Sequence, residues 1–308
     1  MSLLSPRRFA FLARRRLRRL AARLRAARQR AALSRVAVSS LPATTRPPGG
    51  TLRIVAHQDD DLLFQSVSLL ADIDERRPMT TVYLTAGDDD DDEWYWRARE
   101  AGVRAAYAAM LGVGDVWLDG VRELGGVPVA TATLAAAPRV TLLFVRLPDG
   151  GIEGAGGERS GGASLKKLWE GDQPTITCVD GSATHTLASL SGVLRELIDE
   201  TVPDRILSLD HVGAFGDGDH SDHHVAAYLA EQVHAGLPAG GPSFTGYRGY
   251  TIERLPANLS AEQIAAKESA FFTYALSDYK TCSSARACTV RPESLWLARE
   301  YKVSRVSA

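Results

Sequence analysis

The sequence places one imidazole and three consecutive carboxylates in a single turn. Residues 54–64 begin as an apolar strand and end as an apolar helix, and the turn between them carries His57 and three Asp at 59–61. Ligands of α/β proteins bind at the carboxyl ends of strands. His57 and Asp60 can both turn inward on such a loop, and imidazole nitrogen with carboxylate oxygen suits zinc. Asp59 does not easily reach the same metal, which leaves it to act on a bound water.

A second segment supplies the ligand that the first one lacks. A catalytic zinc typically takes three protein ligands and keeps a fourth position for water. His220 and His223 follow a loop rich in Gly and Asp and precede an apolar helical pattern. Because of their spacing, they share one face at the start of a helix. The first motif alone would also fit an ordinary solvated turn, and the matching second motif favours a metal site.

These two motifs resemble those of a known family. Residues 57–61, His-Gln-Asp-Asp-Asp, resemble the His-Pro-Asp-Asp-Glu motif of the LmbE-like, or PIG-L, zinc-dependent de-N-acetylases. Residues 220–223, His-Ser-Asp-His, resemble that family's His-Pro-Asp-His motif. Residues 83–88 resemble its second strand and Thr-x-Gly turn, and residues 147–150, Leu-Pro-Asp-Gly, resemble a loop near the substrate. The resemblance covers roughly residues 51–302.

The resemblance implies a role for each motif residue. Asp59 is implied to be the general base, and His220 to polarise the carbonyl or protonate the leaving amine. Asp222 is expected to orient an imidazole from outside the ligand set. Zinc, or another divalent metal, is implied to be held by three side chains: His57, Asp60 and His223.

The same resemblance predicts contacts to the substrate. Family members carry an Arg in the helix after the second strand that helps to hold the substrate, and Arg97 or Arg99 is the candidate because the register does not decide between them. Asp149 is the further candidate, in the loop at 147–150. Trp94 and Trp96 would either stack on a sugar ring or pack against the body. The implied reaction removes an N-acetyl group from an N-acetylglucosamine-type sugar or glycoconjugate.

The chain departs from the family motifs at three positions. Gln58 and Ser221 replace two prolines, which loosens both turns but removes no ligand. Asp61 replaces a Glu and is shorter by one methylene. Two other classes of function stay open. A metal-dependent phosphoesterase would usually need a second metal about 3.5–4 Å from the first. A non-catalytic carbohydrate-binding protein would have no need of the base, Asp59.

Alternating strands and helices must position these loops. Apolar runs predict strands near 51–56, 80–85, 115–118, 140–146, 205–209 and 244–252. Periodic patterns predict helices near 62–75, 93–111, 187–200, 225–233 and 260–275. This order predicts one α/β domain, residues 51–308, with a Rossmann-like, mostly parallel sheet and flanking helices. No Gly-x-Gly-x-x-Gly follows the first strand, so we expect no nucleotide cofactor.

Charge divides the chain into two parts. Residues 1–50 contain thirteen Arg and no Lys, Asp or Glu, whereas the remainder carries 23 basic and 37 acidic residues. We interpret residues 1–50 as a basic arm, helical near 7–35 with a linker at 39–50, which contacts anionic surfaces or is simply solvated. No specific nucleic-acid partner is expected. The five Asp at 88–92 predict a solvated loop or a cation site beside the pocket, and the Gly-rich residues 149–163 a mobile lid or a disordered loop.

The cysteines bear on localisation. Cys282 and Cys288 are spaced to close a small disulfide, which would indicate an oxidising compartment. Cys178 lies in a β-like run at 175–179 and is expected to be a small buried residue. The chain as given shows no clear signal peptide, and no stretch approaches the ~20 apolar residues of a membrane helix. The cysteine pair therefore hints at export, and the localisation stays open.

Overall fold

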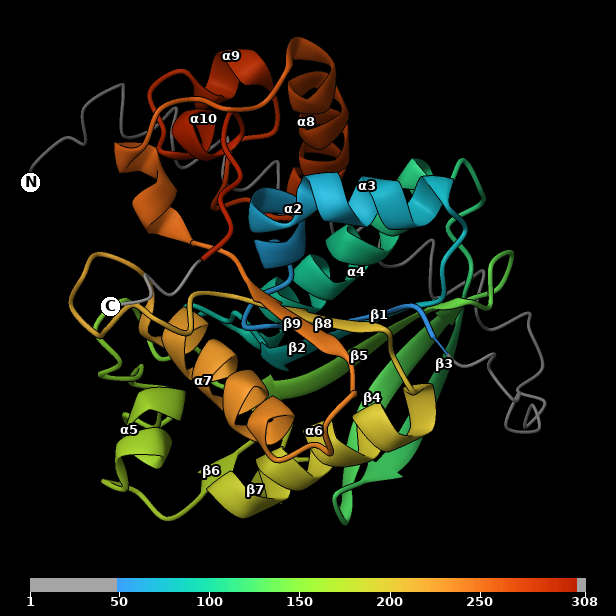
Figure 1. The fold of residues 1–308 in the computed structure, drawn as a ribbon. Coiled ribbons are helices and arrows are strands. Elements are labelled where there is room, and N and C mark those ends of the chain that lie inside the picture. The colour runs from blue at the N-terminus through green and yellow to red at the C-terminus, as the bar shows by residue number, and fades with distance from the viewer. Residues whose placement is uncertain (1–48, 304–308) are drawn as a thin grey trace, which may run out of the picture.

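The structure is a computed structural model and describes residues 49–303. A seven-stranded sheet in the order β3-β4-β5-β2-β1-β8-β9 forms its centre, and β6 and β7 make a separate two-stranded ribbon (Figure 1). The basic helix and most of the linker predicted in the arm lie outside the described residues. The strands are β1 Thr51–Val55, β2 Met79–Thr85, β3 Trp117–Leu124, β4 Val127–Leu134, β5 Val140–Leu147, β6 Ile176–Thr177, β7 Thr184–His185, β8 Arg205–Ser208 and β9 Ser243–Gly246.

Helices cover both faces of this sheet. Figure 1 shows α2, α3, α4 and α8 on one face and α5, α6 and α7 on the other. Within residues 49–303, no helix is long and apolar enough to cross a membrane. The helices are α2 Asp60–Phe64, α3 Ser66–Asp74, α4 Glu93–Met110, α5 Leu165–Glu170, α6 Leu187–Thr201, α7 Ser221–Ala235, the 3-10 helix η1 Tyr250–Arg254, α8 Ala261–Ala275, α9 Ala285–Cys288 and α10 Glu293–Trp296.

The strand directions confirm a mostly parallel α/β sheet. Strands β5, β2, β1, β8 and β9 run parallel, and β3 and β4 add an antiparallel hairpin at one edge. Every residue of β1 and β2 is buried because helices pack on both faces, as is usual for parallel sheets. The carboxyl ends of β1, β2, β5 and β8 therefore meet at one edge, where the predicted motif loops begin.

Several predicted elements differ from the observed ones. The helix predicted at 62–75 is two helices, broken at Gln65, whose side-chain amide donates to the Ser208 carbonyl at 3.0 Å. The strand predicted at 244–252 ends at Gly246. Beyond it, the backbone N–H groups of Gly249 and Tyr250 donate to the Asp219 carboxylate instead of to a neighbouring strand. The run at 175–179 forms only the two-residue strand β6, and β4 was not predicted.

Candidate active site

The loop after β1 is organised around one carboxylate. Oδ2 of Asp60 accepts hydrogen bonds from the backbone N–H groups of Ala56 at 3.0 Å and His57 at 2.7 Å. These bonds leave Oδ1 facing two imidazoles. It lies 3.6 Å from Nδ1 of His57 and 3.1 Å from Nε2 of His223. A side chain held by its own loop is a rigid metal ligand.

The start of α7 brings the two distant histidines to this loop. His220 caps the helix, because its Nδ1 accepts a hydrogen bond from the backbone N–H of Asp222 at 3.2 Å. His223 is fully buried one turn later, and its Nδ1 lies 2.8 Å from Oδ1 of Asp219. That contact turns Nε2 of His223 toward the β1 loop, 3.2 Å from Nδ1 of His57.

Three ligand atoms therefore form a buried triangle. Its edges, between Nδ1 of His57, Oδ1 of Asp60 and Nε2 of His223, measure 3.1, 3.2 and 3.6 Å. Burial by itself would lower the pKa of His223, but Asp60 and Asp219 outweigh it and raise the pKa to about 10. The carboxylates thus favour positive charge at this position. The three residues could hold a metal ion.

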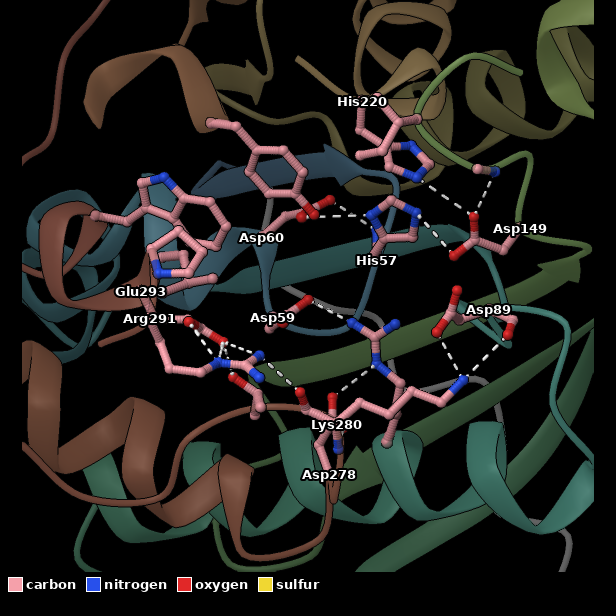
Figure 2. A pocket seen from close by; sticks show the side chains of 18 of the residues that line it. His57, Asp59, Asp60, Asp89, Asp149, His220, Asp278, Lys280, Arg291 and Glu293 are labelled. Atoms are coloured by element: carbon pink, nitrogen blue, oxygen red, sulfur yellow. Dashed lines mark hydrogen bonds and ion pairs between the residues drawn. The ribbon is translucent and has the colours of Figure 1, made fainter. Parts of the chain in front are cut away.

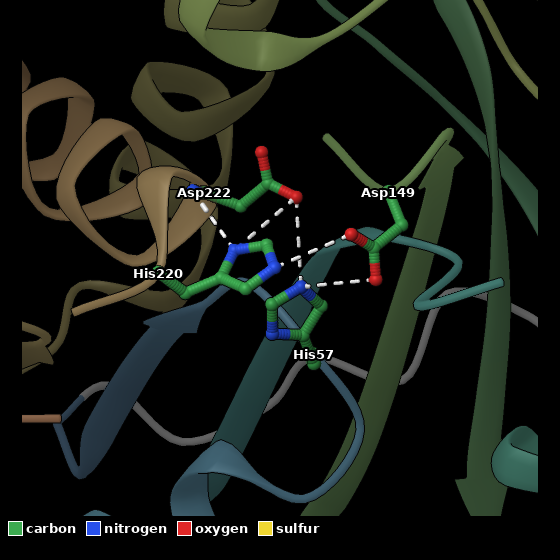
Figure 3. A group of neighbouring side chains, drawn as sticks. All are labelled: His57, Asp149, His220 and Asp222. Atoms are coloured by element: carbon green, nitrogen blue, oxygen red, sulfur yellow. Dashed lines mark hydrogen bonds and ion pairs between the residues drawn. The ribbon is translucent and has the colours of Figure 1, made fainter. Parts of the chain in front are cut away.

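Figure 3 shows a second group that shares His57. Its Nε2 lies 3.6 Å from Oδ2 of Asp149 and 3.5 Å from Oδ2 of Asp222. Nε2 of His220 lies 3.4 Å from Oδ1 of Asp149. All four side chains are buried, and their donor atoms are also close enough to hold a metal ion. His57 therefore faces one group through Nδ1 and the other through Nε2.

The register of α4 places Arg99 in the site and Arg97 outside it. Nη2 of Arg99 lies 2.5 Å from Oδ1 of Asp59, and both residues line the pocket. Burial raises the pKa of Asp59, and the charge of Arg99 only partly offsets that effect. Arg97 instead pairs with Glu93 at 2.6 Å, and its side chain is 41% exposed. Gly87 has φ of 55°, and a Cβ there would lie 2.2 Å from the Arg99 guanidinium.

The third carboxylate of the Asp run lies beneath the site. Oδ2 of Asp61 accepts hydrogen bonds from the hydroxyl of Tyr83 at 3.0 Å and that of Tyr107 at 2.5 Å. Burial raises the pKa of Asp61 to about 6, although the hydrogen bond from Tyr107 by itself lowers that pKa. Asp61 thus ties the β1 loop to β2 and α4.

The acidic loop is less solvated than its composition predicts. Asp88 is buried, accepts a hydrogen bond from the backbone N–H of Asp149 at 2.7 Å, and has a pKa raised by burial to about 6. Asp89 pairs with Lys280 at 2.6 Å. The predicted solvated loop therefore does not include Asp88, whereas Asp89 and Asp90 are exposed. Ser164, the N-cap of α5, donates to the Gly154 carbonyl of the Gly-rich loop at 2.7 Å, and the mobility of that loop stays a prediction.

Trp94 and Trp96 pack rather than face the pocket. Trp96 is 2% exposed, and the guanidinium groups of Arg97 and Arg146 lie over its ring at 4.4 and 5.0 Å. Trp94 stacks against Tyr279, with ring centroids 6.1 Å apart. Of the two alternatives for these indoles, the structure favours packing against the body.

The pocket in Figure 2 combines predicted and unexpected residues. It measures about 280 Å³, and His57, Asp59 and Asp60 from the β1 loop line it. Much of the rest comes from residues beyond 249, which motif spacing could not find. The cysteine pair at 282 and 288 lies in this part of the chain and is bonded. Cys178 is buried, as predicted. The unexpected lining residues are Tyr95, Tyr250, Asp278, Lys280, Thr281, Arg291, Pro292, Glu293 and Trp296.

Comparison with known proteins identifies the family. The model of the PIG-L family, described as GlcNAc-PI de-N-acetylase, matches residues 52–234. The chain belongs to this family. The match includes both motif loops and ends inside α7, so β9 and the helices after it lie beyond the matched segment. The family supports a de-N-acetylase-type hydrolase, and the two His/Asp groups are consistent with a metal site.

Two solved structures are similar to the chain at low identity. One is GalB, the 4-carboxy-2-hydroxymuconate hydratase from Pseudomonas putida, with 14% identity, a TM-score of 0.41, and coverage of 81% of this chain and 82% of that one. The other is a conserved protein from Thermus thermophilus, with 19% identity, a TM-score of 0.39, and coverage of 80% and 83%. A comparison with curated proteins gave no match.

Proposed function

We propose that this PIG-L family member is a zinc-dependent hydrolase that removes the N-acetyl group from an N-acetylglucosamine-type sugar or glycoconjugate. The observation that carries the proposal is the buried triangle of His57, Asp60 and His223. The Asp59 carboxylate lines the same pocket as two of these ligands, His57 and Asp60. The family match over both motif loops supports the same reaction class.

The triangle fits a zinc ion in size and chemistry. Ligands about 2.0–2.1 Å from a tetrahedral zinc lie about 3.4 Å apart, and the observed edges run from 3.1 to 3.6 Å. Two imidazoles and one carboxylate match a known set of catalytic zinc ligands and leave a position open for water. Other divalent metals share part of this preference, so metal content must be measured.

The second group is better suited to supporting the ligands than to binding metal itself. When Nδ1 of His57 serves the metal, Nε2 keeps its proton and points between Asp149 and Asp222. Metal-bound histidines usually donate their other N–H to a carboxylate, which fixes the tautomer and ring orientation. We therefore assign both carboxylates to the outer shell of His57, and Asp149 is also placed to meet the substrate because it lines the pocket.

Zinc bound there would supply Lewis-acid polarisation and lower the pKa of water. Asp59 takes the proton from the attacking water, and its pairing with Arg99 at 2.5 Å holds the carboxylate in place. His220 lies beside His57, with ring centroids 4.6 Å apart, and its Nε2 lies 3.4 Å from Oδ1 of Asp149. It can therefore donate a hydrogen bond to the developing oxyanion or a proton to the leaving amine. The C–N bond of the acetamide breaks, and acetate and the free amine leave.

One experiment tests the proposal. Metal content would be measured in the purified protein by mass spectrometry, together with acetate release from a panel of N-acetylated sugars. We expect one zinc per chain and metal-dependent acetate release. A chain that holds metal but releases no acetate from any N-acetylated sugar would refute the deacetylase function.

A metal-dependent phosphoesterase is the second candidate, and the group of four in Figure 3 is the observation that favours it. Two-metal phosphoesterases clamp the phosphate between their metals. This function requires a second metal per chain and release of p-nitrophenol from p-nitrophenyl phosphate. A stoichiometry of one metal with acetate release would exclude it.

A further inference from the structure

One C-terminal segment forms a wall of the pocket. We call residues 276–300 the strap; it contains α9 and α10 and lies beyond residue 234, where the family match ends. Figure 2 shows its labelled side chains across the pocket from the imidazoles of His57 and His220. The strap residues that line the pocket are Asp278, Lys280, Thr281, Arg291, Pro292, Glu293 and Trp296.

A covalent link holds the strap in this arrangement. Cys282 and Cys288 are bonded and buried, and the two lining segments, 278–281 and 291–296, flank them in the chain. Across this junction, Thr281 donates to the Glu293 carboxylate at 2.7 Å. Nη2 of Arg291 donates to the Lys280 carbonyl at 2.7 Å. The disulfide and these bonds join the two segments into one surface.

The charges of the strap are matched in pairs. Lys280 lies 2.6 Å from Asp89, and Arg291 lies 2.7 Å from Glu293. Asp278 lies 3.4 Å from Arg99. Among the described residues, the whole pocket is lined by six carboxylates and three Lys or Arg side chains. With a divalent metal bound, the lining still carries a net negative charge, so a phosphate would enter against repulsion.

Neutral hydroxyl groups suit this wall better than anions do. A hydroxyl both donates and accepts, so it can bond to a carboxylate and to an ammonium or guanidinium group without breaking their pairing. A phosphate would have to separate Lys280 from Asp89 or Arg291 from Glu293 before it gained a cation. The strap therefore offers many hydrogen-bonding groups and little net attraction for negative charge.

We propose that the strap is the specificity wall of the enzyme, and that it contacts an uncharged, hydroxyl-rich group attached to the N-acetylated sugar. This inference rests on the deacetylase function proposed above. It assigns Lys280, Thr281 and Arg291 to the substrate's aglycone, and it assigns the Cys282–Cys288 disulfide to holding them in place.

The first test compares three substrates: free N-acetylglucosamine, an N-acetylglucosaminide of a neutral sugar, and N-acetylglucosamine 1-phosphate. We expect kcat/KM to be highest for the neutral glycoside and lowest for the phosphate. Calorimetry with the zinc-loaded protein should give the same order of affinities, which separates the two proposals. Binding in this order without acetate release would support the strap and refute the deacetylase, whereas preference for the phosphate, or no preference, would overturn the strap.

Asp89→Asn tests the charge argument. Asp89 is exposed and has φ of 44°, which Asn tolerates, so the variant should fold. Loss of the Asp89 charge leaves Lys280 with one carboxylate partner, Asp91 at 3.4 Å, instead of two. Discrimination against the phosphate should therefore fall about twofold to fivefold. Asp92→Asn removes the same charge from the same acidic run without touching Lys280, and it should leave discrimination unchanged. Equal effects of both variants would contradict a local role for Lys280.

Opening the disulfide tests how the strap is held. The Cys282→Ser/Cys288→Ser variant should have a raised KM for the neutral glycoside, while KM for free N-acetylglucosamine and zinc content stay unchanged. Reductant should raise the same KM in the wild-type protein and leave the KM of the variant unchanged. The wild-type measurement also tests the proposal if the variant folds poorly. An equal rise in KM for both sugars would show that the disulfide supports the whole domain and would overturn its specific role.

Discussion

Replacement of Asp59 by Asn separates proton transfer from the other properties of the site. Asn has the same shape as Asp but cannot take a proton from water. General bases contribute about 10²–10⁴-fold to rate, which corresponds to about 3–5 kcal/mol at 1.36 kcal/mol for each tenfold change. We therefore expect kcat of Asp59→Asn to fall by about 10²–10⁴-fold, with zinc still bound because the three ligands are untouched.

The surroundings of Arg99 indicate that this variant will fold. Arg99 loses its charged partner at 2.5 Å, but its Nε still donates to the Tyr274 hydroxyl at 2.6 Å, and its Nη1 to the Gly87 carbonyl at 2.8 Å. The Asp278 carboxylate remains 3.4 Å away. Loss of one hydrogen bond to a charged group costs about 1.5–3 kcal/mol, which lowers Tm by roughly 3–12 °C in a domain of this size.

The assay is acetate release and zinc content measured on the same preparation. Asp278→Asn is the matched control, because it removes the other carboxylate near Arg99 and leaves the base intact. It should keep most of kcat. A near-wild-type rate for Asp59→Asn would remove Asp59 from the base role. Loss of zinc together with rate would instead make Asp59 a ligand and refute the assignment of the triangle.

Three further predictions concern the ligands, the buried carboxylate and the arm. His57→Ala, Asp60→Ala and His223→Ala should each lose zinc, and three variants that still bind one equivalent with unchanged affinity would refute the site. The pKa of Asp61 is about 6 in the fold, against about 3.9 for an Asp side chain in an unfolded chain, so the folded state binds more protons and stability falls as pH rises from about 4 to 6. Asp61→Asn should remove this pH dependence of stability from acid denaturation curves and keep activity. An unchanged curve would assign the pH dependence to another group. Deletion of residues 1–48 should preserve Tm and activity but abolish salt-sensitive binding to anionic vesicles, because each Arg near such a surface is worth about 1 kcal/mol; loss of folding would show that the arm packs on the domain.

The motif loops were predictable because their chemistry is local in sequence. His57 and Asp60 share one turn, and the backbone of that turn fixes the carboxylate. His220 and His223 share the first turn of one helix. A parallel sheet then brings the two loops together, since its strands end at the same edge. Strand alternation and two short motifs were enough to predict this much.

The choice between Arg97 and Arg99 needed tertiary contacts. Both lie in one helix, and sequence periodicity does not say which face meets the β1 loop. In the structure, α8 packs on α4 and supplies the hydroxyl of Tyr274 to Arg99. The edge hairpin was missed for another reason. Gly125 and Gly126 between two polar, alternating runs form a recognisable hairpin signal that apolar runs alone overlook.

His57 makes the two His/Asp groups one electrostatic unit. Its ring presents Nδ1 to Asp60 and His223 and Nε2 to Asp149 and Asp222. With a cation at Nδ1, the N–H at Nε2 becomes a stronger donor, and the carboxylates that accept it also face His220. Metal binding therefore stabilises the same carboxylates that hold the proposed acid in place. Loss of the metal should therefore weaken both the chemistry at the metal and the positioning of His220, because the single imidazole of His57 transmits the charge between the two groups.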